Sequence, residues 1–129
     1  MDSAIIERIG KDCDQLQSFL SITTSDDPNE LVMRLSELNV WLARSSIMLA
    51  EAKKIQDISM FNAYQEYLSG SVNLPPSALK KYIESQLYDV NFLVNRLDRL
   101  NAACVHIGDN IRTQISFAKE ELKLTRSGY

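Results

Sequence analysis

Apolar residues recur along the last third of the chain in alternating steps of three and four positions. The row begins at Ile83 and ends at Leu122, and no proline interrupts it. Such spacing places its members on one stripe of an α-helix, as in coiled coils. It therefore predicts one long helix over residues 77–125. The stripe consists of Ile83, Leu87, Val90, Val94, Leu97, Asn101, Cys104, Gly108, Ile111, Ile115, Ala118 and Leu122.

Two earlier segments show the same helical spacing and predict helices over residues 3–21 and 28–69. The second segment starts with Asp27 and Pro28, which is typical of a helix N-terminus because aspartate caps and proline fits the first helical position. Glu30 can reach back toward the cap, as in a capping box. The stripe of the second segment weakens at residues 56–59. A break there, which would give a four-helix bundle, is the alternative prediction.

Gly70 and the prolines after it predict a short loop between the two long helices, so these helices are expected to be antiparallel. Folding the chain about this loop brings Leu38 level with Gly108. Ser45 comes level with Asn101, and a buried polar pair of this kind fixes helix register. Gly108 is predicted to permit close helix approach, with a hinge as the alternative.

The predicted fold class is all-α, with one domain over residues 1–129. The architecture expected is a three-helix, antiparallel, up-down-up bundle with a long hairpin of coiled-coil character. The first helix is about half as long as the others, so we expect it to cover only residues 29–50 and 97–122. Residues 51–96 would then lack a third helix.

That uncovered half is rich in aromatic residues, which are enriched at protein interfaces. We predict that a second copy of the chain covers it, in a homodimer or a higher oligomer. The alternative is that the second helix folds back and covers it. Val40 and Ile47 lie on the far side of the second helix and indicate that it has more than one neighbour. The predicted interface residues are Phe61, Tyr64, Tyr67, Tyr82, Tyr88 and Phe92.

Composition limits the function classes. The chain has 17 acidic and 14 basic residues, a balance that gives no overall field to attract nucleic acid or anionic lipid. No apolar run is long enough to cross a membrane, and the N-terminus does not resemble a signal peptide, so a cytoplasmic location is expected. Cys13 and Cys104 are predicted to be reduced, buried core thiols.

The sequence offers no pattern for catalysis, a cofactor or a metal. His106 is the only histidine, and it lies off the apolar stripe of residues 83–122, where a solvated side chain is expected. A nucleophilic triad would have to use His106. A di-iron bundle needs Glu-x-x-His pairs on two helices, and a zinc site would need Cys104, which does not share a helix face with His106. We therefore predict no enzyme activity, no cofactor and no metal.

Three functions follow as hypotheses. The first is a non-catalytic helical assembly or adaptor protein that acts through self-association and protein–protein contacts. The second is a small accessory protein of DNA or RNA metabolism, of phage or bacterial type, that binds nucleic acid weakly. The third is a small helical enzyme with an anion pocket between helices. The basic residues considered for anion or nucleic-acid contact are Lys53, Arg96, Arg99, Lys119, Lys123 and Arg126.

Overall fold

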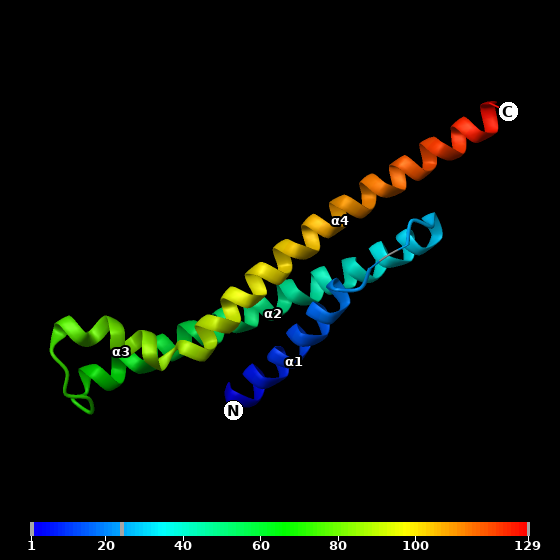
Figure 1. Ribbon diagram of the computed structural model, residues 1–129. Coiled ribbons are helices and arrows are strands. Elements are labelled where there is room, and N and C mark those ends of the chain that lie inside the picture. Colours follow the sequence, from blue (N-terminus) through cyan, green and yellow to red (C-terminus); the bar gives the residue numbers. More distant parts are fainter. Residues whose placement is uncertain (1, 24, 129) are drawn as a thin grey trace.

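The computed structural model describes residues 2–23 and 25–128. These residues form α1 (Asp2–Leu20), α2 (Pro28–Leu68), the 3-10 helix η1 (Pro76–Ala78), α3 (Leu79–Gln86) and α4 (Tyr88–Gly128). The described part of the chain contains no strand, so the predicted all-α helical bundle is confirmed. The two long helices, α2 and α4, cross each other, and α1 lies beside their middle (Figure 1).

Local capping explains where α2 begins and ends. The Asp27 side chain accepts a hydrogen bond from the backbone N–H of Glu30 at 3.2 Å, and Pro28 occupies the first helical position. The Glu30 carboxylate reaches back as predicted, although its partner is the Ser25 hydroxyl. At the other end, Gly70 has a φ of +80°, a conformation that glycine adopts without steric cost.

The α2 helix continues through residues 56–59, so the alternative prediction of a break there is wrong. Gln56 lies inside the helix, and its Nε2 donates a hydrogen bond to Oδ1 of Asn91 on α4 at 2.7 Å. The polar position that weakens the stripe therefore joins the two long helices instead of ending one of them.

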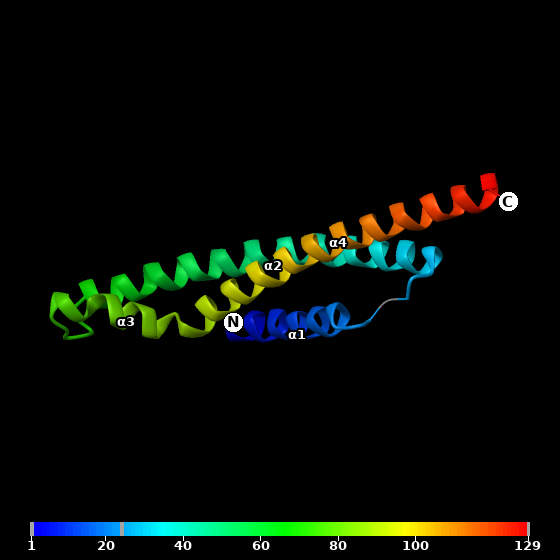
Figure 2. The ribbon, with the colours of Figure 1, turned by 45° about the horizontal axis from the view of Figure 1, so that its top comes forward.

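The third predicted helix, over residues 77–125, is divided at Leu87. This residue leaves the helical conformation, with φ −104° and ψ 12°, although its N–H still bonds to the carbonyl oxygens of Ile83 and Glu84. Figure 2 shows the change of direction between α3 and α4 at this point. No glycine or proline lies there, so we attribute the break to packing. Leu87 is buried in a core cluster that joins Ile83 of α3 to Ala63 of α2. The same cluster includes Val90 of α4, and α4 also packs against α1.

Buried side chains hold α1 beside the middle of the two long helices, and two ion pairs accompany this contact. Arg8 pairs with Glu51 on α2 at 3.0 Å, and Asp14 pairs with Arg96 on α4 at 2.7 Å. Between these pairs, Cys13 is fully buried in the main core cluster, which contains residues from α1, α2 and α4. The bundle therefore has three helices only in its central part.

The position of α1 corrects the prediction that it covers residues 29–50 and 97–122. Arg34 on α2 donates hydrogen bonds to the carbonyl oxygens of Phe19 and Ile22, which places the end of α1 level with the second turn of α2. The linker spans the remaining distance to the start of α2. The C-terminal part of α4 consequently extends beyond both neighbouring helices in both views (Figures 1 and 2).

The helix register agrees with the prediction from the sequence. Asn101 Nδ2 donates to Ser45 Oγ at 2.9 Å, and Ser45 is fully buried. One heptad further along α4, a Cβ atom built at Gly108 would lie 3.5 Å from Cδ2 of Leu38. The two long helices therefore meet at the residues that the hairpin loop brings level.

Gly108 lies inside the continuous α4 helix and is buried, which supports close helix approach over a hinge. We expect Gly108→Ala to raise the free energy of unfolding by about 0.5–1 kcal/mol, because alanine favours helix and its Cβ makes only ordinary contacts. Gly108→Leu should lower it by about 1–3 kcal/mol, because the larger side chain must displace Leu38. Urea denaturation of both variants measures the two effects, and destabilisation by alanine would contradict this view.

Candidate functional site

The six predicted interface residues lie on three helices, α2, α3 and α4. Phe61 and Tyr64 are exposed on α2, while Tyr88 and Phe92 are exposed on α4. A shallow groove at the junction of α3 and α4 is lined by Glu84, Tyr88, Asn91, Phe92 and Asn95. These four aromatic side chains are therefore available on the surface of the single chain, two on each of two helices.

The remaining two predicted residues, Tyr67 and Tyr82, are only half-exposed. Tyr82 packs against the core cluster between α2 and α3, and its hydroxyl donates to a carboxylate oxygen of Glu66 at 3.1 Å. Partial burial, with this hydrogen bond, raises the pKa of Tyr82. Tyr82 therefore helps to hold α3 against the end of α2.

A larger apolar surface runs along the side of α2 that faces away from the core. Large apolar residues recur at a spacing of seven, except where Lys54 takes one of the positions, and each is between 60% and 73% exposed. Residues three positions after them are exposed as well, and two of those are alanines. This two-row spacing is that of a coiled-coil seam. The surface, which we call the outer face of α2, consists of Met33, Ser36, Val40, Ala43, Ile47, Ala50, Lys54, Asp57, Phe61, Tyr64 and Leu68.

The outer face lies opposite the residues that α2 buries. Leu38, Ser45 and Ala52 are almost completely buried, and they project from the side of the helix opposite the outer face. A helix that is apolar on two opposite sides has two apolar neighbours in a stable assembly. Within the chain, α1 and α4 occupy the inner side, and the outer face contacts solvent.

The sequence pattern predicted that Val40 and Ile47 lie on this surface. It did not identify Met33, or the row at spacing seven that joins these residues to Phe61 and Leu68. The signal was present as the spacing of seven from Met33 to Leu68, which only Lys54 interrupts. It was hidden because the inner stripe of the same helix is also apolar, so only the structure shows which stripe the chain itself covers. Two of the six predicted interface residues, Phe61 and Tyr64, belong to the outer face.

The basic residues considered for anion or nucleic-acid contact are spread over the surface. Arg96 donates to Oδ1 of Asp14 at 2.7 Å and to the side-chain oxygen of Gln17 at 2.9 Å, so its guanidinium braces α1 against α4. Lys123 pairs with Glu120 one turn away at 3.6 Å. The other four are exposed: Lys53 on α2, and Arg99, Lys119 and Arg126 on α4.

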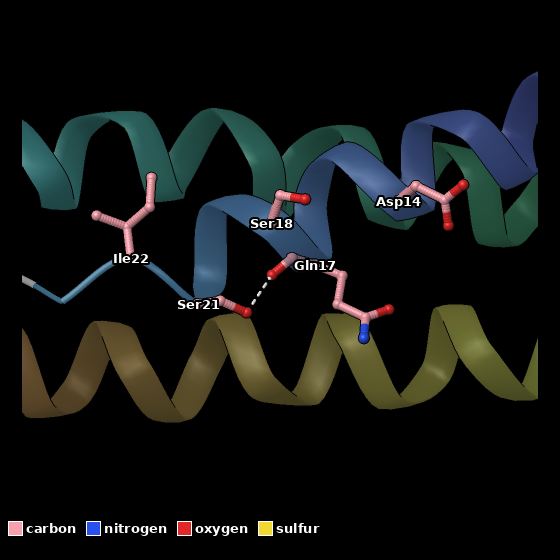
Figure 3. Close-up of a pocket in the computed structure, with 5 residues that line it drawn as sticks. All are labelled: Asp14, Gln17, Ser18, Ser21 and Ile22. Carbon is pink, nitrogen blue, oxygen red and sulfur yellow. Dashed lines mark hydrogen bonds between the residues drawn. The ribbon is translucent and has the colours of Figure 1, made fainter.

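The end of α1 borders an open polar groove (Figure 3). Asp14, Gln17 and Ser18 lie on the last turns of the helix, and Ser21 and Ile22 follow in the linker. The Ser21 hydroxyl donates to the backbone carbonyl of Gln17 at 2.8 Å. Because Asp14 and Gln17 also hold Arg96, the polar groups of this groove stabilise the end of α1.

The residues that could act as nucleophiles are poorly placed for catalysis. Cys13 and Cys104 are buried and free, as predicted, and burial raises the pKa of both thiols. Both are therefore protonated at neutral pH, and a protonated thiol is a weak nucleophile. His106 is exposed on α4. Within residues 2–23 and 25–128, no three His, Cys, Asp or Glu side chains come together as a metal site would require.

Comparison with protein-family models, with curated proteins and with solved structures found no match to this chain. No helix of the described residues combines the length and the apolar character that crossing a membrane needs. The geometry described above therefore provides the basis for a functional proposal, and its most extensive feature is the outer face of α2.

Proposed function

We propose that this protein is a non-catalytic helical assembly protein that acts through self-association and protein–protein contacts. The observation that carries the proposal is the outer face of α2, an exposed and mostly apolar stripe with coiled-coil spacing. Exposed apolar patches of this extent on soluble proteins usually mark interaction surfaces. Because a single helix forms this stripe, the stripe does not enclose a pocket for a small substrate.

The total exposed area supports an assembled state. A compact folded monomer of 14.7 kDa exposes about 6,900 Å² of surface. This chain exposes 8999 Å². The excess of about 2,000 Å² is of the size that a subunit covers in a stable, permanent complex. A homodimer is the simplest such complex, since symmetric dimers are the commonest oligomers.

The free thiols are consistent with the cytoplasmic location expected from the sequence. Cys13 and Cys104 are buried on different helices and are not joined in a disulfide. Proteins of oxidising compartments more often use cysteine in disulfides. We therefore propose that the protein works in the cytoplasm, with no requirement for a cofactor.

Solution mass tests the proposal. At micromolar concentration, sedimentation equilibrium should give a multiple of the 14.7 kDa chain mass. Either Phe61→Ala or Tyr64→Ala, both on the outer face of α2, should weaken association by about 1–3 kcal/mol, because interface energy concentrates in a few aromatic residues. Phe117→Ala is the matched control, since Phe117 is also exposed but lies on the uncovered end of α4. A monomeric wild-type chain would contradict the proposal.

A further inference from the structure

Two charged residues interrupt the apolar rows of the outer face of α2. Lys54 takes the place of a large apolar residue between Ile47 and Phe61, and Asp57 takes the next position of the second row. Both side chains are exposed in the single chain. A lysine or aspartate in a coiled-coil seam lowers stability, but it also selects the register and orientation in which its charge finds a partner.

The two charges have opposite signs and lie one helical turn apart. If a second α2 packs antiparallel on the outer face, the pattern becomes complementary to itself about a point between Lys54 and Asp57. Lys54 then faces Asp57 of the second copy, and Asp57 faces Lys54 of the second copy. A two-fold symmetric interface needs this self-complementarity, because the same patch serves both subunits.

The same register also matches the sizes of the flanking residues. Phe61 faces Ala50 of the second copy, and Leu68 faces Ala43 of the second copy. Tyr64 faces Ile47 of the second copy, and symmetry repeats each of these layers. The paired segment covers residues 43–68 of both chains, about 39 Å of helix. The aromatic end of each α2 is thereby covered by the alanine-rich middle of the other.

Other arrangements of the same two helices leave the charges unsatisfied. A parallel, in-register pair places Lys54 beside its own copy and Asp57 beside its own copy, which is repulsive. An antiparallel pair shifted by one heptad places Asp57 against Ile47 or Phe61, without a cation. Like charges or desolvated charges at an interface cost several kcal/mol and suppress wrong pairings.

We propose that two copies of this chain associate through the outer faces of their α2 helices, antiparallel, with Lys54 of each copy paired to Asp57 of the other. This inference rests on the self-association proposed above and adds its surface, orientation and register. Ile58 and Met60, which flank the outer face and are at least 40% exposed, widen the contact beside the charged layers.

Charge exchange tests the pairing on the full-length chain. Lys54→Asp and Asp57→Lys each create two like-charge contacts by symmetry, so each should raise the dissociation constant of the dimer at least about 100-fold. The double variant Lys54→Asp with Asp57→Lys restores two opposite-charge contacts, and it should return to within about fivefold of wild type. Sedimentation equilibrium over a range of concentrations gives all four constants.

Lys81→Asp and Asp98→Lys are the matched controls, because both side chains are exposed on α3 or α4, away from the outer face. They should leave the dissociation constant unchanged. A wild-type oligomer that resists both single reversals, or a double variant that stays dissociated, would overturn the pairing while leaving self-association intact. A monomeric wild type would instead remove the proposed function itself.

Orientation can be measured separately with nitroxide labels on Gln65→Cys, since Cys13 and Cys104 are buried. Gln65 is exposed beside the outer face. The antiparallel register places the two labelled backbones about 30 Å apart along the helix axes, whereas a parallel pair would place them side by side. A pulsed electron resonance distance near 30 Å supports the proposal, and a distance of the width of two helices excludes it.

Discussion

Leu97→Ala is expected to lower the free energy of unfolding by about 3 kcal/mol, because it removes a fully enclosed side chain and leaves a cavity. Leu97 is 0% exposed in the core cluster where α1, α2 and α4 meet. Single domains are stable by only about 5–15 kcal/mol, so this loss is a large part of the total. Urea denaturation followed by circular dichroism measures it, at one chain concentration because association adds to apparent stability.

Leu122→Ala is the matched control for the cavity variant. Leu122 belongs to the same sequence stripe as Leu97, but it lies on the uncovered end of α4 and is 52% exposed. Its replacement should change the free energy of unfolding by less than about 0.5 kcal/mol. Equal effects at the two positions would mean that α4 is packed along its whole length, contrary to the structure.

Arg34→Ala is expected to destabilise the fold by about 2–3 kcal/mol, because charge-assisted hydrogen bonds inside a protein are costly to remove. The Arg34 Nη2 donates to the carbonyl oxygens of Phe19 at 2.7 Å and Ile22 at 3.0 Å, at the end of α1. Its guanidinium also stacks on the Phe19 ring, with Cζ 4.1 Å from the ring centroid. Loss of the arginine leaves these carbonyl groups without their donor.

The matched control is Arg44→Ala. Arg44 also stacks on an aromatic ring, with Cζ 4.4 Å from the centroid of Trp41, and it pairs with Asp12 at 3.7 Å. Its side chain is 47% exposed, whereas Arg34 is buried, so its contacts compete with water. We expect a loss below about 1 kcal/mol. Hydrogen exchange should show faster opening of α1 in the Arg34 variant alone, and equal exchange in both variants would contradict the bracing role.

The fold could be predicted further than the candidate site. Helix boundaries follow from local features, such as the Asp27 cap and Gly70, that act over a few residues. The candidate site depends on which of two apolar stripes on α2 remains exposed, and this depends on where α1 and α4 pack. The aromatic residues were a good signal for exposure at Phe61 and Tyr64, but they did not indicate a common face with Val40 and Ile47.

The sequence by itself determined the helical class, the extent of α2 and the register between Ser45 and Asn101, because these depend on periodicity, capping and the length of one short loop. Only the tertiary structure decided the break at Leu87 and the level along α2 at which α1 packs. No local residue marks either feature, since each is set by contacts between segments far apart in the chain. The exposed outer face of α2 belongs with these, because exposure is what remains after all other helices have packed.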